Sequence, residues 1–212
     1  MAEQLLKPKR VLETGSEISL RFTPDGFGSA PWKAGEASGK PGQVRIETDE
    51  LVVTEDGHER RVNAGDIQNG ADLLGISAPS GTPAELPVNR AAAAALADWY
   101  AYGTVVLALL IERCPGPDVE PIRLWPEHFD VATVIGDEEA GSRANFGGSP
   151  GDEEHHEPYL YVGPWRQQPE GPVWNATAFP GAELAYAELL ATEDQVETGV
   201  EFLVRHLQAL GS

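Results

Sequence analysis

The sequence of 212 residues contains a single cysteine, Cys114, and a single methionine. One cysteine excludes an intrachain disulfide and a cysteine-based zinc cluster. Positive charge is also scarce, because 15 Lys and Arg face 34 Asp and Glu and all four lysines lie in the first 40 residues. The formal net charge of −19 repels phosphate, which argues against nucleic acids and anionic membranes as partners and favours cations, metals or basic proteins.

The remaining composition is that of an ordinary globular protein. Hydrophobic residues make up 41% of the chain, which suits a soluble protein with a normal core. The first ten residues contain no apolar signal core, so we expect a cytoplasmic protein. We predict a single domain over 1–212, with the alternative of two fused halves: a β-rich half over 11–80, and a half over 88–212 with a helix, a sheet and a second helix.

The first half of the chain is typical of short strands joined by turns. Residues 16–23 alternate apolar and polar side chains until Pro24-Asp25-Gly26 breaks the pattern. Asp56-Gly57 predicts a type I′ hairpin turn, because both central positions of that turn need positive φ. The other elements expected here are a long loop over 28–42, strands over 43–48, 51–54 and 59–62, a short helix over 66–75 and a connector over 77–87.

A long apolar helix is predicted over 89–113. Asn89 can cap its first turn, and Cys114-Pro115-Gly116 ends it. The helix is long enough to cross a membrane. Because it is rich in alanine and carries Asp98 near its middle, we predict instead a buried helix at the centre of a soluble protein.

The second half combines further strands with a final amphipathic helix. Strands are expected over 121–135, 159–162 and 173–179, and a helix over 192–210, with Thr192 and Gln195 as its capping box. The fold class that follows is α+β, in which antiparallel sheet from both halves packs around the helices over 89–113 and 192–210.

Aromatic and polar side chains concentrate between 124 and 174. Tyr159 and Tyr161 would share one face of a strand, and the surrounding rings could line a pocket between 124–130 and 145–165. An aromatic sheet core is the alternative reading of the same residues. The ligand-binding residues predicted for this pocket are Trp125, His128, Asn145, Phe146, Tyr159, Tyr161, Arg166 and Trp174.

A divalent-metal site is the second hypothesis for this region. His128, His156 and Asp130 are the candidate ligands, because imidazole and carboxylate groups bind Zn²⁺, Fe²⁺ or Mn²⁺. A metal-dependent enzyme using His128 and nearby carboxylates is therefore an alternative to a binding protein. Ser149 lacks the Gly-x-Ser-x-Gly context of a hydrolase nucleophile, and we expect Ser149 and Asp152 to cap a structural turn. A third alternative is an acidic module that binds a basic protein.

Three short sequence motifs in this region resemble those of a known family. They are Trp125-Pro126-Glu127-His128-Phe129-Asp130, Ser149-Pro150-Gly151-Asp152 and Pro158-Tyr159-Leu160-Tyr161-Val162. In this order they resemble an uncharacterised family of bacterial proteins, best represented in actinobacteria, and the likeness extends over most of the chain. The resemblance implies a lineage and no particular activity. His155 stands where the family's pattern varies, which favours His128 and His156 as the more interesting pair.

Overall fold

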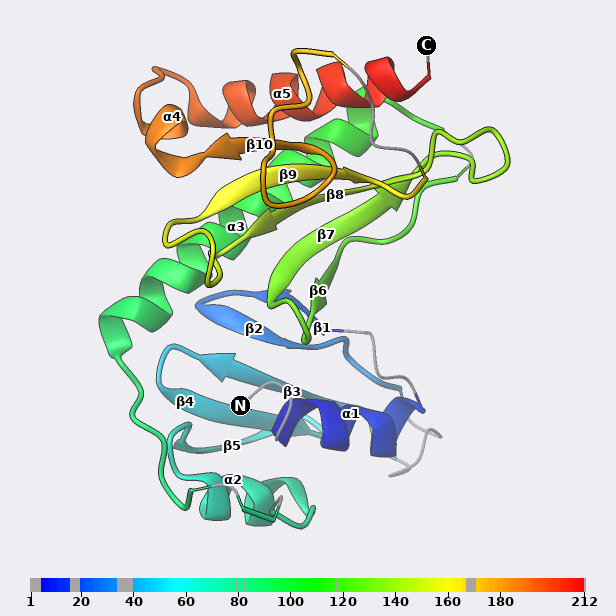
Figure 1. Cartoon of the computed structure of the whole chain (residues 1–212). Helices are drawn as coiled ribbons and strands as arrows, with labels where there is room; N and C mark the ends of the chain where they lie inside the picture. Colours follow the sequence, from blue (N-terminus) through cyan, green and yellow to red (C-terminus); the bar gives the residue numbers. More distant parts are fainter. Residues whose placement is uncertain are drawn as a thin grey trace. The chain divides into compact units, whose positions relative to one another are not determined.

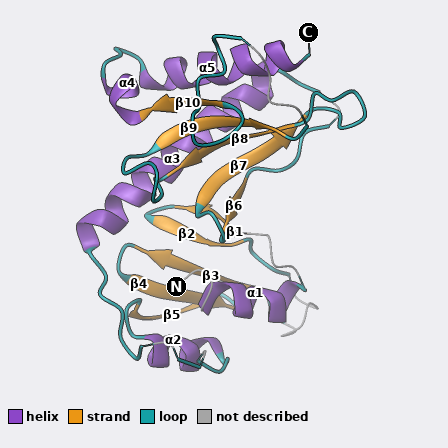
Figure 2. Ribbon diagram, in the orientation of Figure 1, coloured by secondary structure: helices purple, strands orange, loops and turns teal. Residues whose placement is uncertain are grey.

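The computed structural model describes residues 5–15, 20–33, 40–78, 80–81, 83–116, 118–166 and 171–211. These residues form ten strands and five helices, so the predicted α+β class is confirmed (Figure 2). The chain divides into two compact units. Unit 1 comprises Met1–Asp98 with Leu124–Glu127, and unit 2 comprises Trp99–Arg123 with His128–Ser212.

The elements follow one another along the chain as Figure 1 labels them. The helices are α1 (Lys7–Thr14), α2 (Ile67–Leu74), α3 (Arg90–Arg113), α4 (Tyr186–Leu190) and α5 (Gln195–Leu210). The strands are β1 (Leu20–Thr23), β2 (Gly26–Ser29), β3 (Gly42–Glu47), β4 (Glu50–Glu55), β5 (His58–Asn63), β6 (Arg123–Trp125), β7 (Asp130–Ile135), β8 (Ala144–Ser149), β9 (Tyr159–Pro164) and β10 (Ala182–Ala185).

Unit 1 is built on an antiparallel meander of β1 to β5, and β6 joins β1 through Leu124 opposite Leu20. The β4–β5 hairpin turns at Asp56 and Gly57, whose φ angles of 51° and 77° confirm the predicted type I′ turn. The short helix predicted over 66–75 is also confirmed as α2, which Asp66 caps by accepting a hydrogen bond from the backbone N–H of Asn69.

The predicted loop over 28–42 is wrong at its start, because β2 extends to Ser29 and pairs with both β1 and β3. Its glycines permit close strand approach. A Cβ on Gly28 would lie 2.5 Å from the Val44 carbonyl oxygen, so a larger residue would push β3 away. The glycine content that suggests a loop therefore belongs to a tightly packed strand. The rest of the predicted loop includes residues 34–39, which lie outside the described residues.

Unit 2 carries the strand order β7-β8-β9-β10, with each neighbouring pair antiparallel. Its part of α3 and all of α5 cover one face of these strands (Figure 1). A Cβ on Gly148 would lie 3.4 Å from the Trp99 ring, and one on Gly199 of α5 would lie 2.9 Å from Leu160. Leu160 and Val162 are fully buried on this helix-side face.

Helix α3 matches the predicted helix over 89–113, and Asn89 caps it by accepting a hydrogen bond from the backbone N–H of Ala92. Its burial is partial. In an 18-residue window of mean hydropathy 1.6, the length and composition of a membrane span, 39% of the residues are buried. Alanines 91, 92, 94 and 95 are exposed, whereas Tyr100, Val106, Leu107 and Leu110 are fully buried. Core helices of soluble proteins share this length and composition.

Three other expectations for the second half need correction. The single strand predicted over 121–135 is divided into β6 and β7 by a turn in which Phe129 adopts a φ of 56°. Residues 173–179 form no strand, and β10 takes the place beside β9. The final helix begins at Gln195, because the Asp194 side chain accepts a hydrogen bond from the Glu197 backbone N–H, while the Thr192 hydroxyl bonds the Leu189 carbonyl oxygen.

Candidate functional site

The register of the unit 2 strands separates two sets of side chains. Tyr161 lies opposite both Gly147 in β8 and Glu183 in β10, and Gly147 lies opposite Ala132 in β7. Directly opposed residues project from the same side of a sheet. We call this side the outward face, since the helices cover the other one. It carries Asp130, Ala132, Asn145, Gly147, Ser149, Tyr159, Tyr161 and Glu183.

Tyr161 and Asp130 form the inner part of the site. The Tyr161 hydroxyl donates a short hydrogen bond to the Asp130 carboxylate. The ring lies directly over Gly147, where an added Cβ would come within 2.6 Å of it. Gly147 therefore provides the space in which the tyrosine ring reaches across to Asp130. Burial, together with the charge of Asp130, raises the pKa of Tyr161 well above its ordinary value, so the hydroxyl keeps its proton.

The backbone before Asp130 is held by a buried tyrosine of α3. The Tyr100 hydroxyl donates to the Phe129 carbonyl oxygen at 2.7 Å, and the two rings meet edge to face with centroids 5.7 Å apart. Phe129 has a φ of 56°, which is rare for a bulky residue and costs conformational energy. Fully buried Tyr100 thus holds the strained residue from which Asp130 is presented.

A second group of hydrogen bonds joins the 150–158 loop to the same face. Asp152 accepts hydrogen bonds from the backbone N–H groups of Glu154 and His155, both at 2.8 Å, and from the Tyr159 hydroxyl at 2.8 Å. Ser149 accepts one from the Gly151 N–H at 3.1 Å. The predicted turn capped by Ser149 and Asp152 is therefore confirmed. It also places the Asp152 carboxylate against the tyrosines.

His155 joins this loop to β10. Its Nδ1 lies 3.2 Å from an Asp152 oxygen and its Nε2 lies 3.0 Å from a Glu183 oxygen. The imidazole packs on the Tyr159 ring with centroids 4.3 Å apart. The ring centroids of Tyr159 and Tyr161 are 6.2 Å apart. We call the set Asp130, Asp152, His155, Tyr159, Tyr161 and Glu183 the tyrosine–carboxylate network.

Protonation in the network is set by these contacts. Burial alone would raise the pKa of Asp152, but the His155 and Glu154 N–H groups and the Tyr159 hydroxyl lower it to about 2. Burial would lower the pKa of His155, but the hydrogen bond to Asp152 and the charges of Glu183 and Asp152 raise it overall. Burial and Asp152 raise the pKa of Tyr159 to about 12. Clusters of shifted pKa values are characteristic of functional sites.

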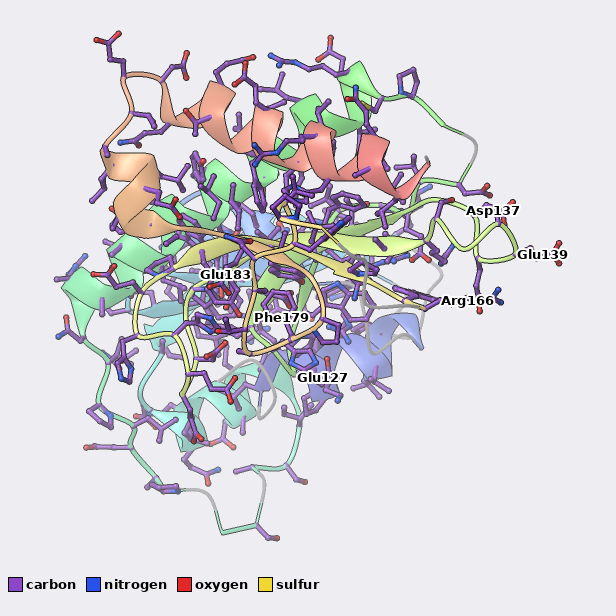
Figure 3. All side chains as sticks on the ribbon, turned by 45° about the horizontal axis from the view of Figure 1, so that its top comes forward. Glu127, Asp137, Glu139, Arg166, Phe179 and Glu183 are labelled. Atoms are coloured by element: carbon purple, nitrogen blue, oxygen red, sulfur yellow. The ribbon has the colours of Figure 1, made fainter. Side chains whose placement is uncertain are left out.

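The segment from Gly171 to Gly181 wraps around the β10 edge. On the helix side, Val173 accepts a hydrogen bond from His206 of α5. At the edge, the Asn175 side chain makes two 3.0 Å hydrogen bonds with the backbone of Glu183. On the outward side, the Phe179 ring meets Tyr161 edge to face at 6.2 Å. Figure 3 labels Phe179 and Glu183 in this region.

Only some of the predicted ligand-binding residues share this site. Asn145, Tyr159 and Tyr161 lie on the outward face, and the Trp165 indole N–H donates to Asn145 at 2.9 Å. Phe146 projects to the helix side and is fully buried, so it is a core residue. Arg166 lies 3.9 Å from Glu138, beside the Asp137–Glu139 turn and away from Glu183 (Figure 3).

The remaining predicted residues lie elsewhere. Trp174 packs on His206 of α5, with ring centroids 4.9 Å apart. Trp125 belongs to unit 1. His128 and His156 have exposed side chains, and the described residues hold no group of three or more His, Cys, Asp and Glu arranged to bind a metal ion. The structure therefore does not bring His128, His156 and Asp130 together as such a group.

Sequence reasoning gave Asp152 a structural role only, ranked His155 below the other two histidines of the region, and missed Glu183. The sequence favours His128 and His156, yet His155 is the histidine held between two carboxylates. The turn preference of Asp152 could have indicated that His155 is held in place. Glu183 offers no local signal, because its contact with His155 depends on the β9–β10 pairing. Comparison with family models, with curated proteins and with solved structures gives no match.

Proposed function

We propose that this chain is a cytoplasmic small-ligand-binding protein whose ligand lies on the outward face of unit 2, against Tyr159, Tyr161 and Asn145. The tyrosine–carboxylate network is the observation that carries the proposal. Four segments that are separate in the sequence contribute to it, and hydrogen bonds fix most of its polar side chains. A preorganised set of polar groups beside aromatic rings is the usual construction of a ligand site.

The charge of unit 2 favours a small organic cation as the ligand. Unit 2 contains five arginines and no lysine, against 18 Asp and Glu. A field of this sign raises the local concentration of cations and disfavours anions such as nucleic acids. The Tyr159, Tyr161 and Phe179 rings add the aromatic faces with which ammonium groups interact favourably.

The proposed bacterial family resemblance is consistent with this location. Each of its three motifs supplies a network residue: the first ends at Asp130, the second at Asp152, and the third contains Tyr159 and Tyr161. Three motifs that are each weak evidence for the family therefore contribute residues to one face of one sheet. The buried Phe146 and the exposed His128 and His156 take no part in the network.

An NMR titration tests the proposal. Choline is the cationic probe, and 3,3-dimethylbutanol, its uncharged isostere, is the control ligand. We expect saturable shifts at the amides of Gly147, Tyr161 and Glu183 with choline and at least ~10-fold weaker binding of the alcohol. Tyr161→Phe should weaken choline by ~10-fold, which corresponds to ~1.4 kcal/mol.

Tyr186→Phe is the matched control, since Tyr186 packs on Trp99 and its substitution removes the same hydroxyl away from the network. Equal choline affinity in the two tyrosine variants, or shifts spread over all acidic loops, would mean that cations collect on a negative surface. The binding-site proposal would then be abandoned.

A further inference from the structure

A small pocket opens at the β10 edge towards the helices, and Glu183 is the one residue that it shares with the tyrosine–carboxylate network. Its volume is about 190 Å³, roughly the space of six water molecules at ~30 Å³ each. Three elements and one loop form its walls: β10, α4, α5 and residues 172–175. The lining residues used below are Val173, Asn175, Glu188, Phe202 and Arg205.

The walls of the pocket are fastened to one another. His206 is fully buried, and its ring nitrogens lie 2.7 Å from the Phe202 carbonyl oxygen and 2.9 Å from the Val173 carbonyl oxygen. It thereby joins the α5 wall to the loop wall. Asn175 joins the loop to β10 through its two hydrogen bonds with the Glu183 backbone. A pocket held in this way does not have to be ordered by its ligand.

A positive and a negative side chain, Arg205 and Glu188, line the pocket and form no ion pair with each other. Arg205 is the one arginine among the described residues of unit 2 with no ion pair to any carboxylate. The Glu188 Oε2 accepts a hydrogen bond from the Ala185 backbone N–H at 3.1 Å, which holds the carboxylate at the start of α4. In a unit with 18 acidic residues, an unpaired arginine lining a pocket is conspicuous.

We propose that this pocket binds a small zwitterion of the α-amino acid type, whose carboxylate pairs with Arg205 and whose ammonium pairs with Glu188. Guanidinium groups bind carboxylates with two parallel hydrogen bonds, and Glu188 retains acceptor capacity for an ammonium. The space of about six heavy atoms matches the smallest amino acids. The pocket shares Glu183 with the network proposed to bind choline, but Arg205 and Glu188 line this pocket and take no part in that network, so the proposal does not depend on choline binding.

Three probes of equal size separate the two charges of the ligand. L-alanine carries both, L-lactate lacks the ammonium, and L-alaninamide lacks the carboxylate. We expect L-alanine to give saturable NMR shifts at Asn175, Glu188 and Arg205, with a Kd at least ~10-fold lower than those of the other two probes. If L-alaninamide binds as tightly as L-alanine, the pocket merely attracts cations and the proposal is overturned.

Variants at matched positions complete the test. Arg205→Gln should raise the Kd for L-alanine by at least ~10-fold. Arg166→Gln removes the same charge from another exposed arginine of unit 2 and should leave the Kd unchanged. Glu188→Gln keeps an acceptor for the Ala185 N–H but should also weaken binding. Unchanged affinity in Arg205→Gln, or no saturable shift with L-alanine, would overturn the proposal, while choline binding to Arg205→Gln tests the other site independently.

Discussion

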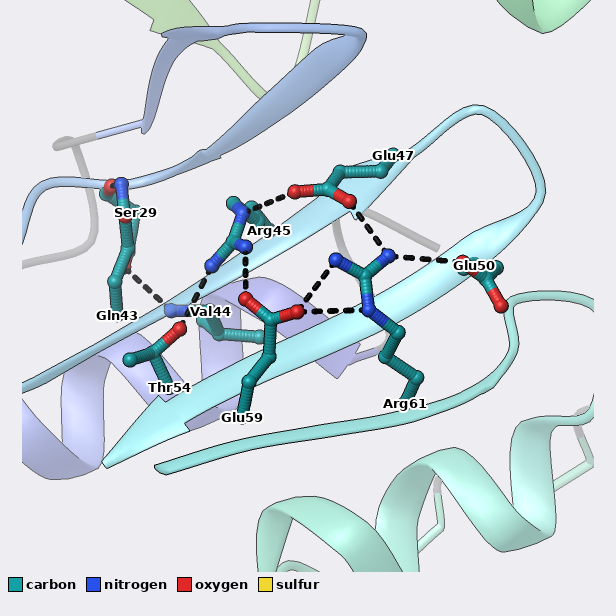
Figure 4. A network of polar contacts seen from close by, with 9 residues as sticks. All are labelled: Ser29, Gln43, Val44, Arg45, Glu47, Glu50, Thr54, Glu59 and Arg61. Carbon is teal, nitrogen blue, oxygen red and sulfur yellow. Dashed lines mark hydrogen bonds and ion pairs between the residues drawn. The ribbon is translucent and has the colours of Figure 1, made fainter. Parts of the chain in front are cut away.

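The exposed sheet faces of the two units handle charge in different ways. In unit 1, Arg45 bonds Glu47 and Glu59 at 2.6 Å each, and Arg61 bonds Glu47, Glu50 and Glu59 (Figure 4). In unit 2, Asp152 and Glu183 are held by tyrosine, histidine and backbone donors. Unit 1 has ten Lys and Arg against 16 Asp and Glu, whereas unit 2 has five against 18.

This difference separates a structural use of charge from a chemical one. Arginine keeps its charge at every accessible pH, so Arg45 and Arg61 permanently offset most of the charge of the three glutamates that they bind. Such charged side chains also protect the exposed edge strand β5 from pairing with other chains. Hydroxyl and N–H donors fix a carboxylate without cancelling its charge. The unit 2 face therefore stays negative and titratable, as a site for cations requires.

The largest expected effect compares the two faces of the unit 2 sheet. If the outward face is a binding surface, side chains on the helix side should contribute more to the free energy of unfolding than side chains on the outward face. Phe146→Ala should lower the free energy of unfolding by ~3–5 kcal/mol, because it leaves a cavity in a fully packed position. Phe179→Ala makes the same change on the outward face, where the Phe179 ring packs on Tyr161 and is half-buried. It should lower the free energy of unfolding by only ~1 kcal/mol. Urea denaturation measures both. Equal losses would make the outward face a second core and would remove the contrast with a binding surface.

A smaller effect concerns Asp152, whose pKa of about 2 lies below its ordinary 3.8. A lowered folded-state pKa adds stability that is present above pH ~4 and is lost as the pH falls towards ~2. Because the carboxylate is largely exposed, solvent screening reduces the contribution to ~1 kcal/mol. Asp152→Asn should lose that amount at pH 7.

The difference between wild type and Asp152→Asn should therefore vanish between pH ~4 and ~2. Denaturation curves over this range provide the measurement. Glu153→Gln, which removes one carboxylate charge from the same loop, is the control. A gap between wild type and Asp152→Asn that persists at pH ~2 would show that the turn needs the aspartate for its shape and not for its charge.

Local signals in the sequence identified local structure well. The Asp56-Gly57 turn, the Asn89 cap and the turn at Ser149 and Asp152 each depend on residues within three positions of one another, so the sequence was sufficient. Alternation in β9 likewise placed Tyr159 and Tyr161 on one face, and their ring contact confirms it.

Contacts between distant segments could not be obtained in this way. Asn145 and Phe146 are neighbours with opposite roles, and only the pairing of β8 with β7 and β9 decides which one faces the helices. His155 meets Glu183 across 28 positions, through a strand that the sequence did not predict. A one-residue slip in either register would exchange core and site residues.

The smallest expected effect compares how salt acts on the two faces. Arg61 is largely exposed, and the Glu59, Glu47 and Glu50 hydrogen bonds raise its pKa above the ordinary value, so its charge is constant and only screening can weaken its ion pairs. Arg61→Gln should destabilise unit 1 slightly at ~0.05 M NaCl and have no effect at ~1 M, where the Debye length is ~3 Å. Arg90→Gln, which breaks a single exposed pair with Asp49 at 3.5 Å, should show no resolvable change at either concentration.

Tyr161→Phe, in contrast, should destabilise the protein equally at both salt concentrations, since a buried hydroxyl-to-carboxylate hydrogen bond is screened much less than an exposed pair. Urea denaturation of the three variants at both salt concentrations makes the comparison, and a salt-dependent loss in Tyr161→Phe would mean that both faces are held by screened surface charge.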